Sequence, residues 1–135
     1  MIEVYGCGID IEELARFDRH IGDDDRSLME DVCTRRELDN VPGDRRLSLA
    51  LRFSCKEAFF KTYSSSWTHS GISWKDIELL FEGPGHDRYR VQLSGHAEKI
   101  LNENNAVVGE ILLDYTEEFV MFQVVLLQKP SRPAV

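Results

Sequence analysis

Short apolar stretches predict most of the strands of this chain. In residues 89–93 the apolar side chains fall on every second position, which is typical of a half-buried strand. The stretches interpreted as strands are residues 2–10, 77–81, 89–93, 106–115 and 119–128. The last of these is apolar on both faces, so we expect it to be central in its sheet and covered.

The longest helical pattern covers residues 46–63, where Leu49, Phe53 and Phe60 recur at helical spacing. Shorter helices are expected at residues 12–17 and 94–101. Asp25 would cap another short helix that ends at Val32. A fourth would begin at Thr34, with Glu37 three residues later as in a capping box. Because helices and strands mix without a regular βαβ order, we expect an α+β fold. Its largely antiparallel sheet would wrap around the long central helix.

Charge and composition narrow the classes of partner. The chain has 135 residues and a net charge of −8, which argues against non-specific binding to nucleic acid. No apolar run approaches the roughly 18 residues of a membrane span. We expect one domain over residues 1–128 and a flexible tail over residues 129–135. The scattered cysteines, expected to be reduced in a cytoplasmic protein, are Cys7, Cys33 and Cys55.

Charged residues at two places, the end of the first strand and the long helix, are candidates for catalysis or metal binding. Asp10 ends an apolar strand just after two glycines, Gly6 and Gly8, which allow close backbone approach. In the long helix, Glu57 and Lys61 share one face, while Arg52 and Lys56 lie on a neighbouring one. Magnesium is typically held by one or two carboxylates together with substrate phosphates, which fits Asp10, Glu57 and these cations. Taken singly, such an Asp is often only a cap, and such helix pairs are mostly solvated. The histidines show no metal-ligand spacing and are expected at the surface: His20, His69, His86 and His96.

Three sequence blocks, in order, resemble one known family. They are Gly-Ile-Asp-Ile at residues 8–11, Arg-Phe-Ser-Cys-Lys-Glu-Ala-Phe-Phe-Lys at residues 52–61, and Ile-Ser-Trp-Lys-Asp-Ile-Glu at residues 72–78. The chain resembles the holo-acyl-carrier-protein synthases, the small single-domain members of the 4′-phosphopantetheinyl transferase superfamily. The second block is the most specific of the three, and the resemblance spans roughly residues 1–127.

The resemblance implies an enzyme that moves the phosphopantetheine arm of coenzyme A onto a serine of an acyl carrier protein. By position, Asp10 and Glu57 would hold Mg²⁺, and Glu57 or a water it orients would take the serine proton. Lys61 would contact the pyrophosphate, with Arg52 and Lys56 as further phosphate contacts. Arg16 matches a residue that contacts the carrier protein, and the family is typically a homotrimer with sites between protomers.

The chain also departs from the family pattern. Leu112, Asp114 and Tyr115 stand where the family usually has Ser, Ser or Thr, and His, and residues 85–88 alter a turn near the adenine. An Asp near coenzyme A phosphates would repel them. The alternative hypothesis is therefore a divergent homologue without catalysis, acting as a carrier-protein-binding or scaffolding subunit. An unrelated small α+β domain would require all three blocks to be coincidence.

Overall fold

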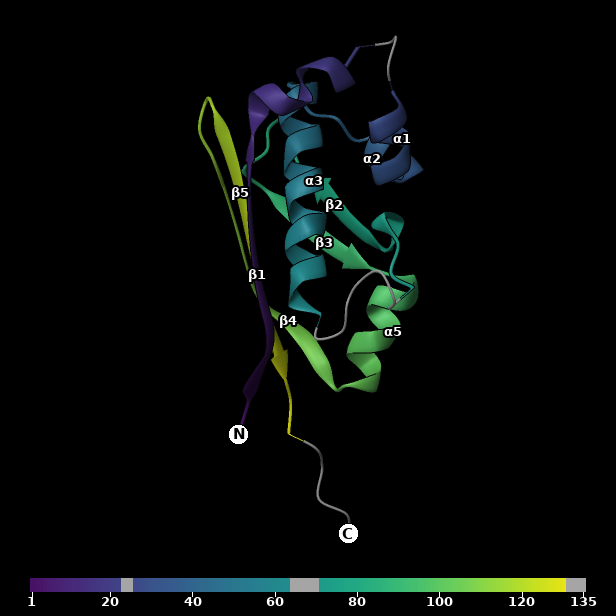
Figure 1. The fold of residues 1–135 in the computed structure, drawn as a ribbon, viewed down its shortest axis with the longest axis vertical. Coiled ribbons are helices and arrows are strands. Elements are labelled where there is room, and N and C mark those ends of the chain that lie inside the picture. The colour runs from purple at the N-terminus through teal and green to yellow at the C-terminus, as the bar shows by residue number, and fades with distance from the viewer. Residues whose placement is uncertain (23–25, 64–70, 131–135) are drawn as a thin grey trace.

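The computed structural model describes residues 1–22, 26–63 and 71–130, and its centre is one long helix, α3 (Arg45–Thr62) (Figure 1). The strands are β1 (Glu3–Glu13), β2 (Ile77–Phe81), β3 (Tyr89–Leu93), β4 (Ala106–Tyr115) and β5 (Phe119–Gln128). The other helices are η1 (Leu14–His20), α1 (Ser27–Val32), α2 (Arg35–Leu38), η2 (Trp74–Asp76) and α5 (Gly95–Glu103). The expected α+β class with antiparallel sheets is confirmed.

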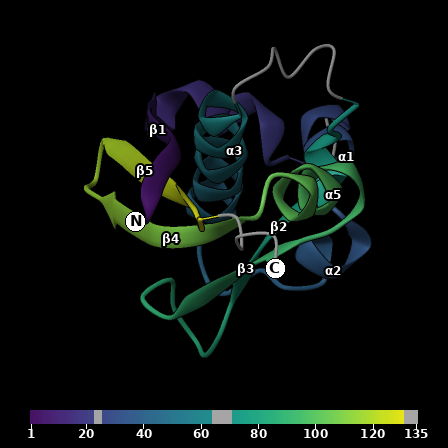
Figure 2. The ribbon, with the colours of Figure 1, turned by 90° about the horizontal axis from the view of Figure 1, so that it is seen from below.

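The strands form two antiparallel sheets that both contact α3. One sheet has the order β1-β5-β4, and the other pairs β2 with β3. Figure 2 shows the three-stranded sheet on one side of α3 and the short helices α1, α2 and α5 on the other, with β2 and β3 next to β4. The central position expected for β5 is confirmed. Its inner face is buried and its outer face is half-exposed, so within one chain only one face is covered.

The packing of β1 against α3 depends on two glycines. A Cβ on Gly6 would lie 1.8 Å from the carbonyl oxygen of Thr62, and one on Gly8 would lie 2.1 Å from that of Ala58. No real side chain tolerates such distances, so the close approach expected from the sequence is present. Strand and helix run in opposite directions here, which brings the next inward residue, Asp10, beside the second half of α3.

Some boundaries differ from those predicted. β1 continues to Glu13, because Glu12 and Glu13 pair with β5 residues, and the expected helix over residues 12–17 is instead η1. Thr34 and Glu37 form the predicted capping box of α2. Asp25 and residues 131–135 of the expected tail lie outside the described residues, while the Lys129 N–H still donates to the Asn105 carbonyl at 2.9 Å. In the described ranges, no helix is both long and apolar enough to cross a bilayer.

Candidate active site

Asp10 lies on the inner face of β1, where Gly8, Asp10 and Glu12 are buried and the residues between them are exposed. Its backbone carbonyl accepts a hydrogen bond at 3.0 Å from the hydroxyl of Ser54 in α3. The residue is only 7% exposed. The strand and the helix together hold this carboxylate at a fixed place between them.

Lys61 reaches Asp10 from the last turn of α3. Its ammonium donates to Asp10 Oδ1 at 3.1 Å and to the Ile9 carbonyl at 3.0 Å, and its side chain is half-exposed. The other carboxylate oxygen, Asp10 Oδ2, is buried and has no hydrogen-bond partner among the described residues. A buried oxygen left without a partner is costly, so this position favours a bound donor or cation.

Glu57 lies one helical turn before Lys61 and is half-buried. Burial and the negative charge of Asp10 raise the pKa of Glu57, while the charges of Lys61 and Arg16 act in the opposite direction. The structure therefore brings together the three residues that the sequence singled out, Asp10, Glu57 and Lys61. Their catalytic and metal-binding roles stay predictions.

Glu12 is a fourth charged residue at this place, and the sequence analysis missed it. Its carboxylate accepts a hydrogen bond from Arg16 Nη1 at 2.6 Å. Burial and the negative charge of Asp10 raise the pKa of Glu12 to about 7, and Arg16 opposes this rise. The available signal was the spacing of Asp10 and Glu12, since residues two apart on a strand share a face.

The carboxylates at this site suit a hard cation that would also bind phosphate oxygens of a substrate. Over residues 1–22, 26–63 and 71–130, no three His, Cys, Asp or Glu side chains already form a metal-binding group. Magnesium, however, is commonly held by one or two carboxylates plus phosphate oxygens and waters. Asp10, with its unpartnered oxygen, and Glu57 offer such a pair.

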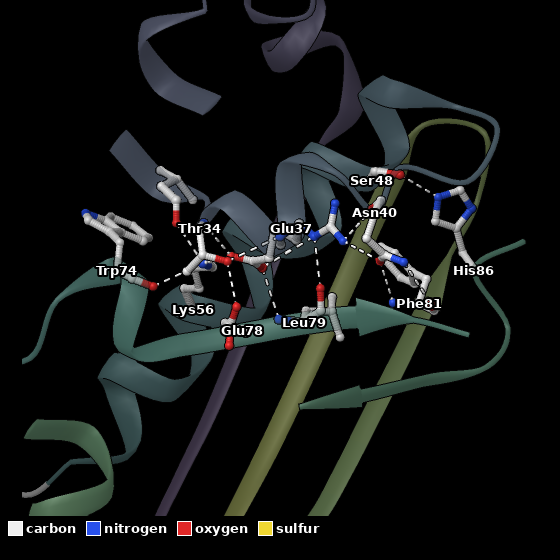
Figure 3. Close-up of polar contacts among 12 residues, drawn as sticks. Thr34, Glu37, Asn40, Ser48, Lys56, Trp74, Glu78, Leu79, Phe81 and His86 are labelled. Atoms are coloured by element: carbon white, nitrogen blue, oxygen red, sulfur yellow. Dashed lines mark hydrogen bonds and ion pairs between the residues drawn. The ribbon is translucent and has the colours of Figure 1, made fainter. Parts of the chain in front are cut away.

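Arg52 and Lys56 occupy a different place, the interior between α3 and β2, where Figure 3 shows Lys56. The Lys56 ammonium is fully buried and donates to Glu37 Oε1 at 2.6 Å, to the Val32 carbonyl at 2.7 Å and to the Trp74 carbonyl at 3.0 Å. All three protons of this ammonium have an acceptor. This geometry leaves no face of Lys56 for a phosphate.

Arg52 is similarly enclosed, at 2% exposure. It donates to the Leu79 carbonyl at 2.9 Å and to Asn40. It also lies 3.4 Å from Glu37 Oε2 and over the ring of Phe81. The expectation that Arg52 and Lys56 contact phosphates does not fit these positions. Both cations instead join α3 to α2 and β2 through the buried carboxylate of Glu37, which also accepts from the Leu79 N–H at 3.0 Å.

The residues that depart from the family pattern point in two directions. Leu112 and Asp114 are exposed on the outer face of β4. Tyr115 instead lines a cavity of about 440 Å3 with Leu14, Asp44 and Arg46, and its hydroxyl hydrogen-bonds Asp87 at 3.3 Å. The altered segment therefore contributes one side chain, Tyr115, to this cavity.

The expectation that His86 lies at the surface is wrong. His86 is 6% exposed, hydrogen-bonds the Ser48 hydroxyl at 2.8 Å (Figure 3) and packs edge-on against Phe81. Burial lowers its pKa, the charge of Arg52 lowers it further, and Asp44 and Asp87 oppose the shift. It fixes the turn between β2 and β3 to the start of α3, next to Tyr115.

Comparison with known proteins agrees with the family resemblance of the sequence and with the fold. Residues 6–110 match the ACPS family, described as the 4′-phosphopantetheinyl transferase superfamily. A holo-[acyl-carrier-protein] synthase of Geotalea daltonii is 33% identical over 102 residues, which is 74% of this chain and 79% of that protein. The crystal structure of holo-[acyl-carrier-protein] synthase from Neisseria meningitidis is 25% identical, with a TM-score of 0.76 over 94% of this chain and 100% of that one.

A second structure, a holo-(acyl-carrier-protein) synthase from Bacillus anthracis in complex with CoA (3′,5′-ADP), is 26% identical. Its TM-score is 0.68, with 93% of this chain and 98% of that chain covered. The fold, the three sequence blocks and these relatives agree. The chain therefore belongs to the 4′-phosphopantetheinyl transferase superfamily and, within it, to the enzymes of the holo-acyl-carrier-protein synthase type.

Proposed function

We propose that this enzyme transfers the 4′-phosphopantetheine group of coenzyme A to a serine hydroxyl of an acyl carrier protein, with release of adenosine 3′,5′-bisphosphate, and requires Mg²⁺. The observation that carries the proposal is the convergence of Asp10 and Lys61, which form an ion pair at 3.1 Å, with the carboxylate of Glu57. Two carboxylates and an exposed ammonium match what a metal-bound diphosphate needs. The relatives named above supply the reaction and its substrates.

Each side chain then has a distinct task. Asp10 and Glu57 hold the ion, whose charge when bound offsets the charge that builds on the leaving phosphate. Lys61 keeps part of its ammonium exposed while Asp10 and the Ile9 carbonyl orient it, so it can also contact a pyrophosphate oxygen. Glu57, directly or through a water, accepts the proton of the attacking serine.

The carrier protein would approach at the exposed guanidinium of Arg16. Its side chain is 60% exposed and lies above the ring of Phe53, at 5.2 Å from the centroid. With a net charge of −8, attraction of an acidic partner depends on local cations such as Arg16 rather than on the overall field. The free thiols of Cys7, Cys33 and Cys55 suit the cytoplasmic location expected from the sequence.

We also propose the homotrimer that the resemblance implies, with the outer face of the three-stranded sheet as its contact. Ile9 of β1 and Leu112 of β4 flank Gln123 of β5 in one row across this face. Large apolar side chains exposed on this sheet are Val4, Ile9, Ile11, Val107, Leu112 and Phe119. A sheet face that exposes several large apolar side chains is typical of a protein interface.

The test is conversion of purified apo-carrier proteins, incubated with the enzyme, coenzyme A and Mg²⁺ and weighed by intact-protein mass spectrometry. The proposal expects a mass gain of one phosphopantetheine group on a carrier. The gain should be absent with excess chelator and absent on a carrier whose acceptor serine is alanine. Conversion that continues at full rate in chelator would contradict the proposed requirement for Mg²⁺. If no carrier is converted while a known transferase is active in parallel, the proposed transfer reaction is contradicted.

A further inference from the structure

We propose that Phe53 is a positioning residue for the carrier protein, because its ring holds the guanidinium of Arg16 in the orientation that the carrier meets. This inference rests on the proposed function, since docking of the carrier at Arg16 is part of it. In the sequence, Phe53 belongs only to the apolar stripe of the long helix. The inference therefore gives a residue of the apolar core a task in the recognition of a protein partner.

Arg16 lies at the edge of the candidate active site. Its Nη1 donates to the Glu12 carboxylate at 2.6 Å, and its charge reaches Glu57, where it opposes the rise in pKa that burial and Asp10 cause. A protein that brings its serine hydroxyl to this site must cover the surface around it. Because the Arg16 side chain is 60% exposed, it is available to a carboxylate of that protein.

Two aromatic rings lie close to this guanidinium. The central carbon of the Arg16 guanidinium is 5.2 Å from the centre of the Phe53 ring and 5.9 Å from the centre of the Phe17 ring. At such distances a cation is attracted to the negative face of an aromatic ring. The Phe53 ring and the Glu12 carboxylate therefore hold the guanidinium together, and Phe53 is the nearer of the two rings.

The Phe53 ring is itself fixed by the core. It stacks on Trp74, with the ring centres 5.3 Å apart, and meets Phe17 edge-on at 5.4 Å. Phe53 is only 8% exposed. A ring packed on several sides keeps one rotamer, so the position of Arg16 depends on the packing of α3 against η1.

An arginine that is fixed in advance binds a partner more tightly. A free arginine side chain loses much of its conformational freedom when it pairs with a carboxylate, and this loss weakens the complex. A guanidinium that already rests on a ring loses less. Phe53 therefore strengthens carrier binding through Arg16.

The experiment measures steady-state transfer by the full-length enzyme with coenzyme A and Mg²⁺, over a range of concentrations of an apo-carrier protein. Phe53→Leu removes the ring and should raise the KM for the carrier roughly twofold to fivefold, with an unchanged KM for coenzyme A. The matched control is Phe59→Leu, which removes a fully buried ring of the same helix and should leave the KM for the carrier unchanged. Arg16→Gln should raise it at least as much as Phe53→Leu does.

A double-mutant cycle separates positioning from a loss of structure. In the Arg16→Gln background, Phe53→Leu should have no further effect on the KM for the carrier, because the group that the ring positions is gone. A polyfluorinated phenylalanine at position 53 nearly keeps the shape of the ring but weakens its negative face. This variant should raise the KM for the carrier even if Phe53→Leu folds poorly.

Independent effects of Phe53→Leu and Arg16→Gln, equal KM values for the carrier in Phe53→Leu and Phe59→Leu, or an unchanged KM in the fluorinated variant would overturn the inference while docking at Arg16 stands. A wild-type KM for the carrier in Arg16→Gln would instead contradict the carrier contact of the proposed function, and the inference with it.

Discussion

The Lys61 ammonium lies 3.1 Å from Asp10 Oδ1, although the two residues are 51 positions apart. Two features make this ion pair possible: the alternation of β1, which turns Asp10 inward, and the glycines that let the strand touch α3. The chemistry of the site therefore depends on backbone packing several residues away from it.

Replacement of Gly8 by Ala should damage both the fold and the site. The new Cβ would lie 2.1 Å from the Ala58 carbonyl oxygen, so β1 must move away from α3 and take Asp10 with it. Overpacking of this kind costs about 1–3 kcal/mol. We expect a lower midpoint in urea and slower phosphopantetheine transfer. Gly22→Ala is the control, because a Cβ there meets nothing within 4 Å. Equal midpoints for the two variants would contradict the packing described.

Glu37→Gln should be among the most destabilising changes of a single charge. It leaves the fully buried Lys56 ammonium without its counter-ion, and removal of one partner from such a pair costs about 3–5 kcal/mol. Asp39→Asn, which breaks the exposed pair with Arg35, should cost less than about 1 kcal/mol. Urea unfolding followed by fluorescence measures both changes.

The same network predicts a difference between the lysines of α3. Folded Lys56→Met should keep its affinity for coenzyme A in calorimetry, because Lys56 has no exposed face, whereas Lys61→Met should lose affinity. A selective loss in Lys56→Met, with its fold intact, would restore the phosphate-binding role that the sequence suggested for it.

The parts of this structure that were predictable from sequence are those set by local patterns. Short apolar stretches predicted the strands at residues 106–115 and 119–128 with the bounds observed, and the spacing of Thr34 and Glu37 predicted the capping box. Asp10, Glu57 and Lys61 were found because they stand in blocks that resemble a known family. Each of these signals lies within about ten consecutive residues.

The parts that were missed depend on partners far along the chain. Lys56 looks like a surface cation in sequence, and its burial depends on Glu37, 19 positions earlier, and on the Val32 and Trp74 carbonyls. His86 was expected at the surface because its partner, Ser48, is 38 positions away. Charged or polar residues are buried when they are paired, and the pairing is a property of the fold.

His86 should make the protein sensitive to mild acid. Its pKa is lowered in the folded state, chiefly by burial, so below its ordinary value near 6.5 the unfolded chain binds the proton more readily. The free energy of unfolding should therefore fall as pH decreases from about 6.5 to 5. The neighbouring charges are Asp44, Asp87 and Arg52. Urea titrations of wild type and His86→Gln across this range should show a smaller decrease in the variant, and parallel curves would exclude the effect.

The outer face of the three-stranded sheet predicts the assembly state. Sedimentation equilibrium should give three times the chain mass of 15.6 kDa for the wild type. Leu112→Lys puts a charge on the exposed apolar face and should shift the protein toward monomer. Lys99→Glu, on the exposed side of α5, should not. A wild-type monomer at all concentrations would contradict the homotrimer.

The most direct test of the site is the Mg²⁺ dependence of carrier-protein conversion by Asp10→Asn and Glu57→Gln. Both changes are nearly isosteric, so folding should be retained, which circular dichroism checks. If the two carboxylates share the ion, each variant should lose transfer by about a hundredfold or more at limiting Mg²⁺. Wild-type turnover by either folded variant at limiting Mg²⁺ would contradict the assignment of that residue to the metal site.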